Sequence, residues 1–166
     1  MTFAYGKEKV IKMIIIGSDH AGYALKESLK QNLEKQNLAY VDCGCDGSSV
    51  DYPDIAETVC RRVLKDSASN AKGVIICGTG VGVSIAANKI VGIRAALCAD
   101  YYTAKYTRKH NDSNVICLGG RTLGADVAWE LLNVWLNTEF IGGRHSMRVN
   151  KIKSIEEREN KEKNNE

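Results

Sequence analysis

Short apolar runs recur along the chain, at residues 13–17, 38–43, 73–77, 93–99 and 114–118. They are rich in Val, Ile and Cys and do not alternate with polar residues, which is typical of strands covered on both faces. Between them, apolar residues repeat at helical spacing, as Leu25, Leu29 and Leu33 do. Pro53 stands where a second helix would begin, the position at which proline is best tolerated. The alternation predicts a three-layer α/β/α, Rossmann-like fold around a five-stranded parallel sheet.

The pattern changes after Phe140, where Gly142 and Gly143 break the helical spacing and a highly charged segment begins. Ile152 and Ile155 are the only apolar residues after Val149. Because so few apolar side chains cannot bury a helix against its own domain, a C-terminal helix lying across a partner subunit is favoured. We therefore expect an N-terminal extension outside the domain, one domain that includes the C-terminal helix, and a disordered tail, at residues 1–12, 13–157 and 158–166.

Composition narrows the function classes. The 166 residues carry a formal net charge of only +3, with 44% apolar and 26% charged residues. So small a charge, with no basic and aromatic residues interleaved on one stripe, argues against a nucleic-acid partner. The apolar runs fall well short of the roughly 20 residues of a membrane span. Six cysteines without a CxxC pair, after a polar start, predict reduced thiols in a cytoplasmic protein.

Polar and glycine-rich segments follow the predicted strands. Ligands of open parallel sheets bind beyond the carboxyl ends of the strands, so we expect these segments to gather at one edge of the sheet. They are Ser18–Gly22, Cys77–Gly82, Asp100 with the following Arg108–Asp112, and Gly119–Arg121.

The segment Gly78–Gly82 places three glycines between a strand and a helix. Its backbone N–H groups could hold a phosphate, or an oxygen that becomes negative during a reaction. A plain tight turn and a dinucleotide-binding loop are the alternatives, although GxGxG after the third strand is not the dinucleotide pattern. Cys77 lies just before this loop, where backbone dipoles favour a thiolate that could act as a base. The alternative is a buried strand cysteine like Cys98 or Cys117.

Histidines and arginines supply further candidates. None of the three histidines lies in an apolar run, and no HxxxH or HxH pair predicts a metal site. His110 closes a helical segment, a position suited to proton transfer. Arg144 and Arg148 are four residues apart and would share a helix face that suits a phosphate dianion, or would simply be solvated. Arg121 adds a third cation after the fifth strand.

Taken in order, these motifs resemble the ribose-5-phosphate isomerase B family, which includes allose- and galactose-phosphate isomerase relatives. The resemblance runs from about Met13 to Glu157. It is carried by Ser18–Gly22, Asp51–Pro53, Cys77–Gly82, Ser84–Lys89, Gly92–Ala95, His110–Asp112 and Gly142–His145.

The resemblance implies catalytic roles for Cys77, His110 and Thr79. Cys77 matches the base that moves a proton between C1 and C2, and His110 the group that opens the furanose ring. A second branch of the family has serine at the position of Cys77 and glutamate at that of Val81, so this chain resembles the cysteine branch. Substrate contacts are implied for Asp19, His20, Gly78, Thr79, Gly80, Val81, Gly82, Asn111, Arg121, Arg144 and Arg148.

The implied activity is interconversion of D-ribose 5-phosphate and D-ribulose 5-phosphate through an enediolate, without metal or cofactor. In the family, His110 and Asn111 reach the site from the neighbouring subunit, so a homodimer or a dimer of dimers with shared sites is implied. An allose- or galactose-6-phosphate isomerase is the nearest alternative. A non-catalytic nucleotide- or sugar-phosphate-binding module is a third.

Overall fold

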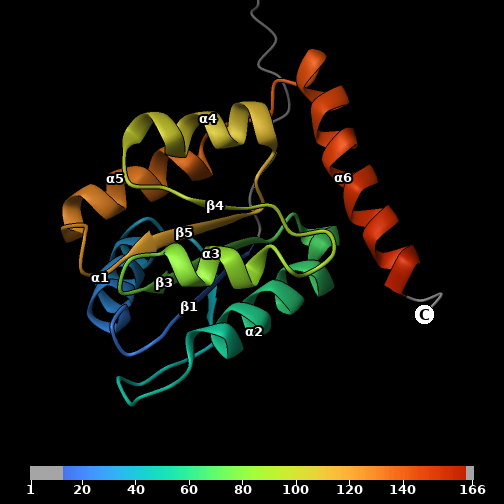
Figure 1. Ribbon diagram of the computed structural model, residues 1–166. Helices are drawn as coiled ribbons and strands as arrows, with labels where there is room; N and C mark the ends of the chain where they lie inside the picture. The colour runs from blue at the N-terminus through green and yellow to red at the C-terminus, as the bar shows by residue number, and fades with distance from the viewer. Residues whose placement is uncertain (1–12, 164–166) are drawn as a thin grey trace, which may run out of the picture.

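The computed structural model describes residues 13–163 of the chain. Five parallel strands form one sheet in the order β2-β1-β3-β5-β4 (Figure 1). The strands are β1 (Ile14–Ser18), β2 (Tyr40–Asp42), β3 (Lys72–Cys77), β4 (Ala95–Leu97) and β5 (Val115–Gly119). The helices are α1 (Tyr23–Lys35), α2 (Tyr52–Lys65), α3 (Val81–Ala87), α4 (Tyr101–Asn111), α5 (Ala125–Leu136) and α6 (Arg144–Lys163), with a 3-10 turn at Ser67–Ser69.

Two apolar layers cover the sheet, as the continuous apolar runs predicted. Successive residues of β1 alternate between them: Ile14 and Ile16 pack with α1, α4 and α5, whereas Ile15 packs with α2 and α3. The helices accordingly lie on both faces of the sheet (Figure 1). The predicted three-layer α/β/α fold is confirmed.

Local sequence signals set the helix ends. Pro53 stands in the first turn of α2, as its sequence position predicted. Asp100 begins α4, because its side chain accepts a hydrogen bond from the Thr103 N–H at 2.8 Å. Asp112 closes α4 in the left-handed region, at φ 48°. The local sequence therefore fixes the residues at which these helices begin and end.

Helix α6 runs along the side of the domain (Figure 1). The Gly92 N–H donates to the Glu156 carboxylate at 3.0 Å, yet Ile152 and Ile155 remain 45% and 52% exposed. The helix continues to Lys163, six residues beyond the boundary expected at 157, whereas the predicted extension 1–12 and residues 164–166 lie outside the described part of the chain. In the described residues, every helix is too short or too polar to span a bilayer.

Candidate active site

Three loops meet at the carboxyl edge of the sheet. They follow β1, β3 and β5, and backbone hydrogen bonds join them. The Asp19 N–H donates to the Ile76 carbonyl at 3.1 Å, and the Gly120 N–H donates to the Cys77 carbonyl at 2.8 Å. The Arg121 N–H donates to the Gly78 carbonyl at 2.9 Å. Three of the predicted polar segments therefore lie together around the end of β3.

Cys77 lies at the centre of this group. Its side chain is only 5% exposed, and its Sγ accepts a hydrogen bond from the Gly80 N–H at 3.1 Å. A sulfur that accepts from a backbone amide is stabilised as an anion. Burial raises the pKa of Cys60 and of Cys98 to about 12, and it also raises the pKa of Cys117 well above its ordinary value. Those three cysteines belong to the core and are unsuited to proton transfer near neutral pH.

Gly80 makes this arrangement possible. Its φ is +79°, and a Cβ added to it would lie 2.5 Å from Leu97 Cδ1 and 3.0 Å from the Leu118 carbonyl carbon. We expect Gly80→Ala to destabilise the protein by about 1–2 kcal/mol, because left-handed backbone is costly for alanine, and to lower kcat. Gly124→Ala is the matched control, since no atom lies within 4 Å of its added Cβ. Melting temperatures and kcat of both variants check this; an active, stable Gly80→Ala protein would contradict it.

The other predicted residues of this edge are placed as follows. Asp19 is 7% exposed, and its Oδ1 accepts from the Gly22 N–H at 2.9 Å, so one carboxylate oxygen holds the turn that begins α1. His20, Thr79 and Arg121 are exposed at the ends of the three strands. A Cβ added to Gly78 would lie 3.5 Å from Arg121 Nη1, which places this guanidinium beside the loop. The Arg121 guanidinium therefore lies beside the loop that follows Cys77, and His20 is exposed at the end of the neighbouring strand β1.

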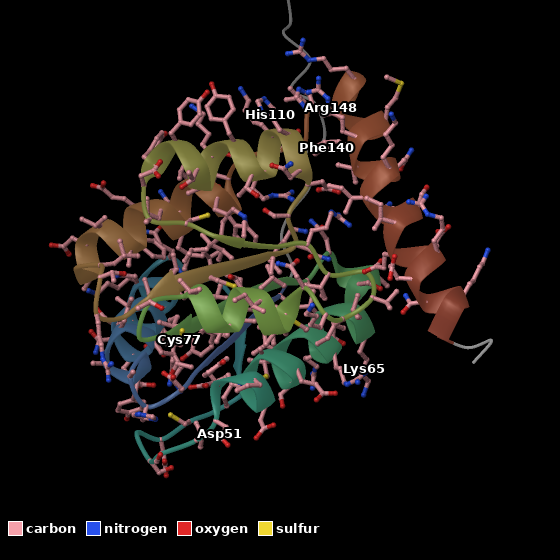
Figure 2. The ribbon with its side chains drawn as sticks, viewed as in Figure 1. Asp51, Lys65, Cys77, His110, Phe140 and Arg148 are labelled. Atoms are coloured by element: carbon pink, nitrogen blue, oxygen red, sulfur yellow. The ribbon has the colours of Figure 1, made fainter. Side chains whose placement is uncertain are left out.

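His110, Asn111, Arg144 and Arg148 lie elsewhere. The Asn114 N–H, three residues after α4, donates to the Arg94 carbonyl at 3.1 Å, directly before β4 begins. The end of α4 is therefore at the amino edge of the sheet, opposite Cys77. Figure 2 shows His110 and Arg148 together near the start of α6, away from Cys77. The expectation that Arg108–Asp112 joins the other segments at one edge is wrong, because α4 runs antiparallel to the strands and carries its last turn to the opposite edge.

Hydrogen bonds hold the residues at the end of α4 in place. The Arg108 Nη1 donates to Asp112 Oδ1 at 2.8 Å and to the Ser113 carbonyl at 2.6 Å. Arg94 donates from Nη2 to the Asp112 carbonyl at 2.7 Å and from Nε to the Asn111 carbonyl at 3.1 Å. These bonds fix the turn that carries His110 and Asn111, while Asn111, Arg144 and Arg148 remain exposed.

Two residues absent from the predicted site contact it. The Tyr52 ring packs on Gly82, where an added Cβ would lie 2.8 Å from the Tyr52 Cζ atom. His145 stacks on His110, with ring centroids 4.0 Å apart. Both lie inside motifs visible in the sequence, but only the close packing of α2 on α3 and of α6 on α4 reveals their contacts.

The fold and the buried thiol define a class: an open parallel α/β protein that binds small molecules at the carboxyl edge of its sheet. Residues 14–152 match the family model described as Ribose/Galactose Isomerase. The chain belongs to this family and is an isomerase.

Similar proteins and solved structures support the assignment to this family. Ribose-5-phosphate isomerase B of Escherichia coli is 41% identical over 151 residues, covering 90% of this chain and all of that protein. The Clostridium thermocellum ribose-5-phosphate isomerase B structure superposes with a TM-score of 0.84 at 46% identity, covering 88% of this chain and 98% of the other. The Mycoplasma genitalium ribose-5-phosphate isomerase B with bound ribulose-5-phosphate gives 0.83 at 39%, covering 87% and 96%.

Proposed function

We propose that this protein interconverts D-ribose 5-phosphate and D-ribulose 5-phosphate. The observation that carries the proposal is the Cys77 sulfur at the end of β3, held by the Gly80 N–H inside the glycine loop. Support comes from the similarity to the Mycoplasma genitalium enzyme that binds ribulose-5-phosphate. Six free thiols suit a reducing compartment, so we place the activity in the cytoplasm.

The chemistry is a proton transfer between neighbouring carbons. Cys77 takes the proton from C2 of the open-chain aldose, and the C–H electrons form the C1–C2 double bond while the carbonyl oxygen becomes an enediolate. Loop amides, with Thr79 at their centre, stabilise that oxygen, at about 3 kcal/mol for each well-placed donor. The thiol proton is then delivered to C1 while the proton of the O2 hydroxyl passes to O1, so that C2 becomes the carbonyl carbon of the ketose. The step needs neither a hydride acceptor nor an electron sink.

The complete site is composed of two chains. Ring opening by His110 and phosphate binding by Arg144 and Arg148 require these residues near Cys77, yet one chain holds them at the opposite edge of its sheet. A second copy would supply them, making a homodimer or a dimer of dimers. Val81 and Ile85 of α3 are 46% and 59% exposed beside the Cys77 loop, an apolar surface that a second chain would cover.

Positively charged side chains bind the phosphate end of the substrate. Arg121 and His20 lie at the Cys77 edge, and Arg144 with Arg148 would approach from the partner with Asn111 on the sugar hydroxyls. Guanidinium groups bind a phosphate dianion through paired hydrogen bonds. Binding energy at the phosphate orients C1 and C2 against the thiol, so it contributes to rate as well as affinity.

A panel of aldose phosphates tests the substrate. We expect kcat/KM for ribose 5-phosphate to exceed that for allose 6-phosphate and galactose 6-phosphate by about tenfold or more, the usual discrimination for one added carbon. Preference for a six-carbon sugar would favour the alternative that the family description also contains. No turnover, with thermal stabilisation by NAD or AMP alone, would indicate a nucleotide-binding module instead.

A further inference from the structure

The imidazole of His110 lies between two aromatic rings. His145 stacks on it almost in parallel, with centroids 4.0 Å apart and an interplanar angle of 4°. Tyr106 meets it edge to face, at 4.9 Å and 65°. Tyr106 is stacked in turn on Tyr102 at 4.1 Å, one helical turn further away. His110 therefore has an aromatic neighbour from its own helix and one from α6.

The backbones that present these rings are tied to each other. The Ile141 N–H, just before α6, donates to the Lys109 carbonyl at 3.2 Å. The His145 N–H donates to the Gly142 carbonyl at 3.1 Å in the first turn of α6. His145 is only 4% exposed, although Arg144 before it and Met147 after it are exposed. A histidine that is buried in the charged face of a helix is held there by packing, here against His110.

The surroundings of His145 are strongly cationic. Desolvation, then His110, Arg144 and Arg148, lower the pKa of His145, which favours the neutral form of its ring. On the α4 side, the Lys109 ammonium lies 5.5 Å from the Tyr106 ring, and Arg108 is paired with Asp112. A neutral flat ring can stack against His110 in either protonation state of His110 without adding a second charge.

We propose that His145 is a positioning residue for His110, holding the imidazole that opens the sugar ring in its productive orientation. This inference rests on the proposed function, because it assigns His145 to the ring-opening step alone. Stacking fixes the ring plane of His110, and proton transfer to a ring oxygen depends steeply on that orientation. His145 itself need not touch the substrate.

Two substitutions separate positioning from substrate binding. His145→Ala removes the stacked ring, whereas His145→Phe keeps a flat ring and removes both nitrogens. Tyr102→Leu is the matched control, because Tyr102 contacts Tyr106 and not His110. Turnover of ribose 5-phosphate requires ring opening. Exchange of the C1 hydrogen of ribulose 5-phosphate with deuterated water does not, because its O5 is esterified and no furanose can form.

We expect His145→Ala to lower kcat for ribose 5-phosphate about 10- to 100-fold with C1 exchange nearly unchanged. His145→Phe and Tyr102→Leu should keep most of the wild-type activity in both assays. If His145→Phe loses as much as His145→Ala, or if either variant raises KM in both assays, the positioning role is overturned. An inactive wild-type protein would instead overturn the proposed function, so the two failures are distinguishable.

Discussion

Replacing Cys77 with alanine is expected to lower kcat for ribose 5-phosphate about 1,000-fold while KM stays near its wild-type value. The thiol lies directly before the glycine loop, and its sulfur accepts a hydrogen bond from the Gly80 N–H within that loop. The phosphate-binding arginines are untouched by the change, so ground-state binding should survive. Steady-state kinetics with ribose 5-phosphate measure both constants.

Two further variants test whether the expected loss of activity in Cys77→Ala is due to the missing proton carrier or to altered packing. Cys77→Ser keeps an acceptor for the Gly80 N–H but offers a hydroxyl that is a poor proton carrier, so it should be as inactive as the alanine variant. Cys117→Ala removes a fully buried thiol of the same apolar layer and should cost about 1 kcal/mol of stability with kcat unchanged. Equal loss from Cys117→Ala and Cys77→Ala would show that packing, not chemistry, explains the effect.

Co-expression of two inactive variants should restore activity. In a mixed dimer of Cys77→Ala and His110→Asn chains, one site carries both changes and the other carries neither. Random pairing makes half of the dimers mixed, so about a quarter of wild-type activity is expected. The gain in activity on co-expression is expected to be large because each variant alone should be nearly inactive. The measurement is the specific activity of the co-expressed protein purified through one tag that both chains carry, so that all three kinds of dimer are recovered.

The matched control pairs Cys77→Ala with Cys77→Ser. Both changes lie in the same group of residues, so no combination of these chains contains an intact site and activity should stay absent. A mixture of Cys77→Ala and His110→Asn that remains equally inactive would contradict a site shared between chains. Either His110 would then act within its own chain, or it would not act on the sugar held at Cys77.

The sequence predicted the sheet well because strands that are buried on both faces form continuous apolar runs. Such runs can be recognised without knowing which strands pair with each other. Runs such as 73–77 and 114–118 became β3 and β5 almost residue for residue. Three-residue strands were harder: β4 covers only Ala95–Leu97 of the run 93–99, since it lies at the edge of the sheet and pairs only with β5. Edge position is a property of topology, not of local composition.

For the site, the sequence indicated which residues lie together only where those residues belong to the same loop. The loop Cys77–Gly82 could be interpreted directly, because its thiol and amide lie three residues apart. The placement of His110 could not, since it depends on where α4 ends relative to the strands. The stacking of His145 on His110 depends on how α6 packs across α4. Contacts between helices that are distant in sequence leave no periodic signal.

The most direct test of the central claim, proton transfer by the Cys77 thiol, is isomerisation in deuterated water followed by mass and NMR analysis of the ketose. We predict deuterium at C1 of the ribulose 5-phosphate formed by the wild-type protein, because a thiol exchanges its proton with solvent between the two transfers. Rapid turnover by Cys77→Ala with the same deuterium at C1 would show that another group carries the proton, and would contradict a thiol base.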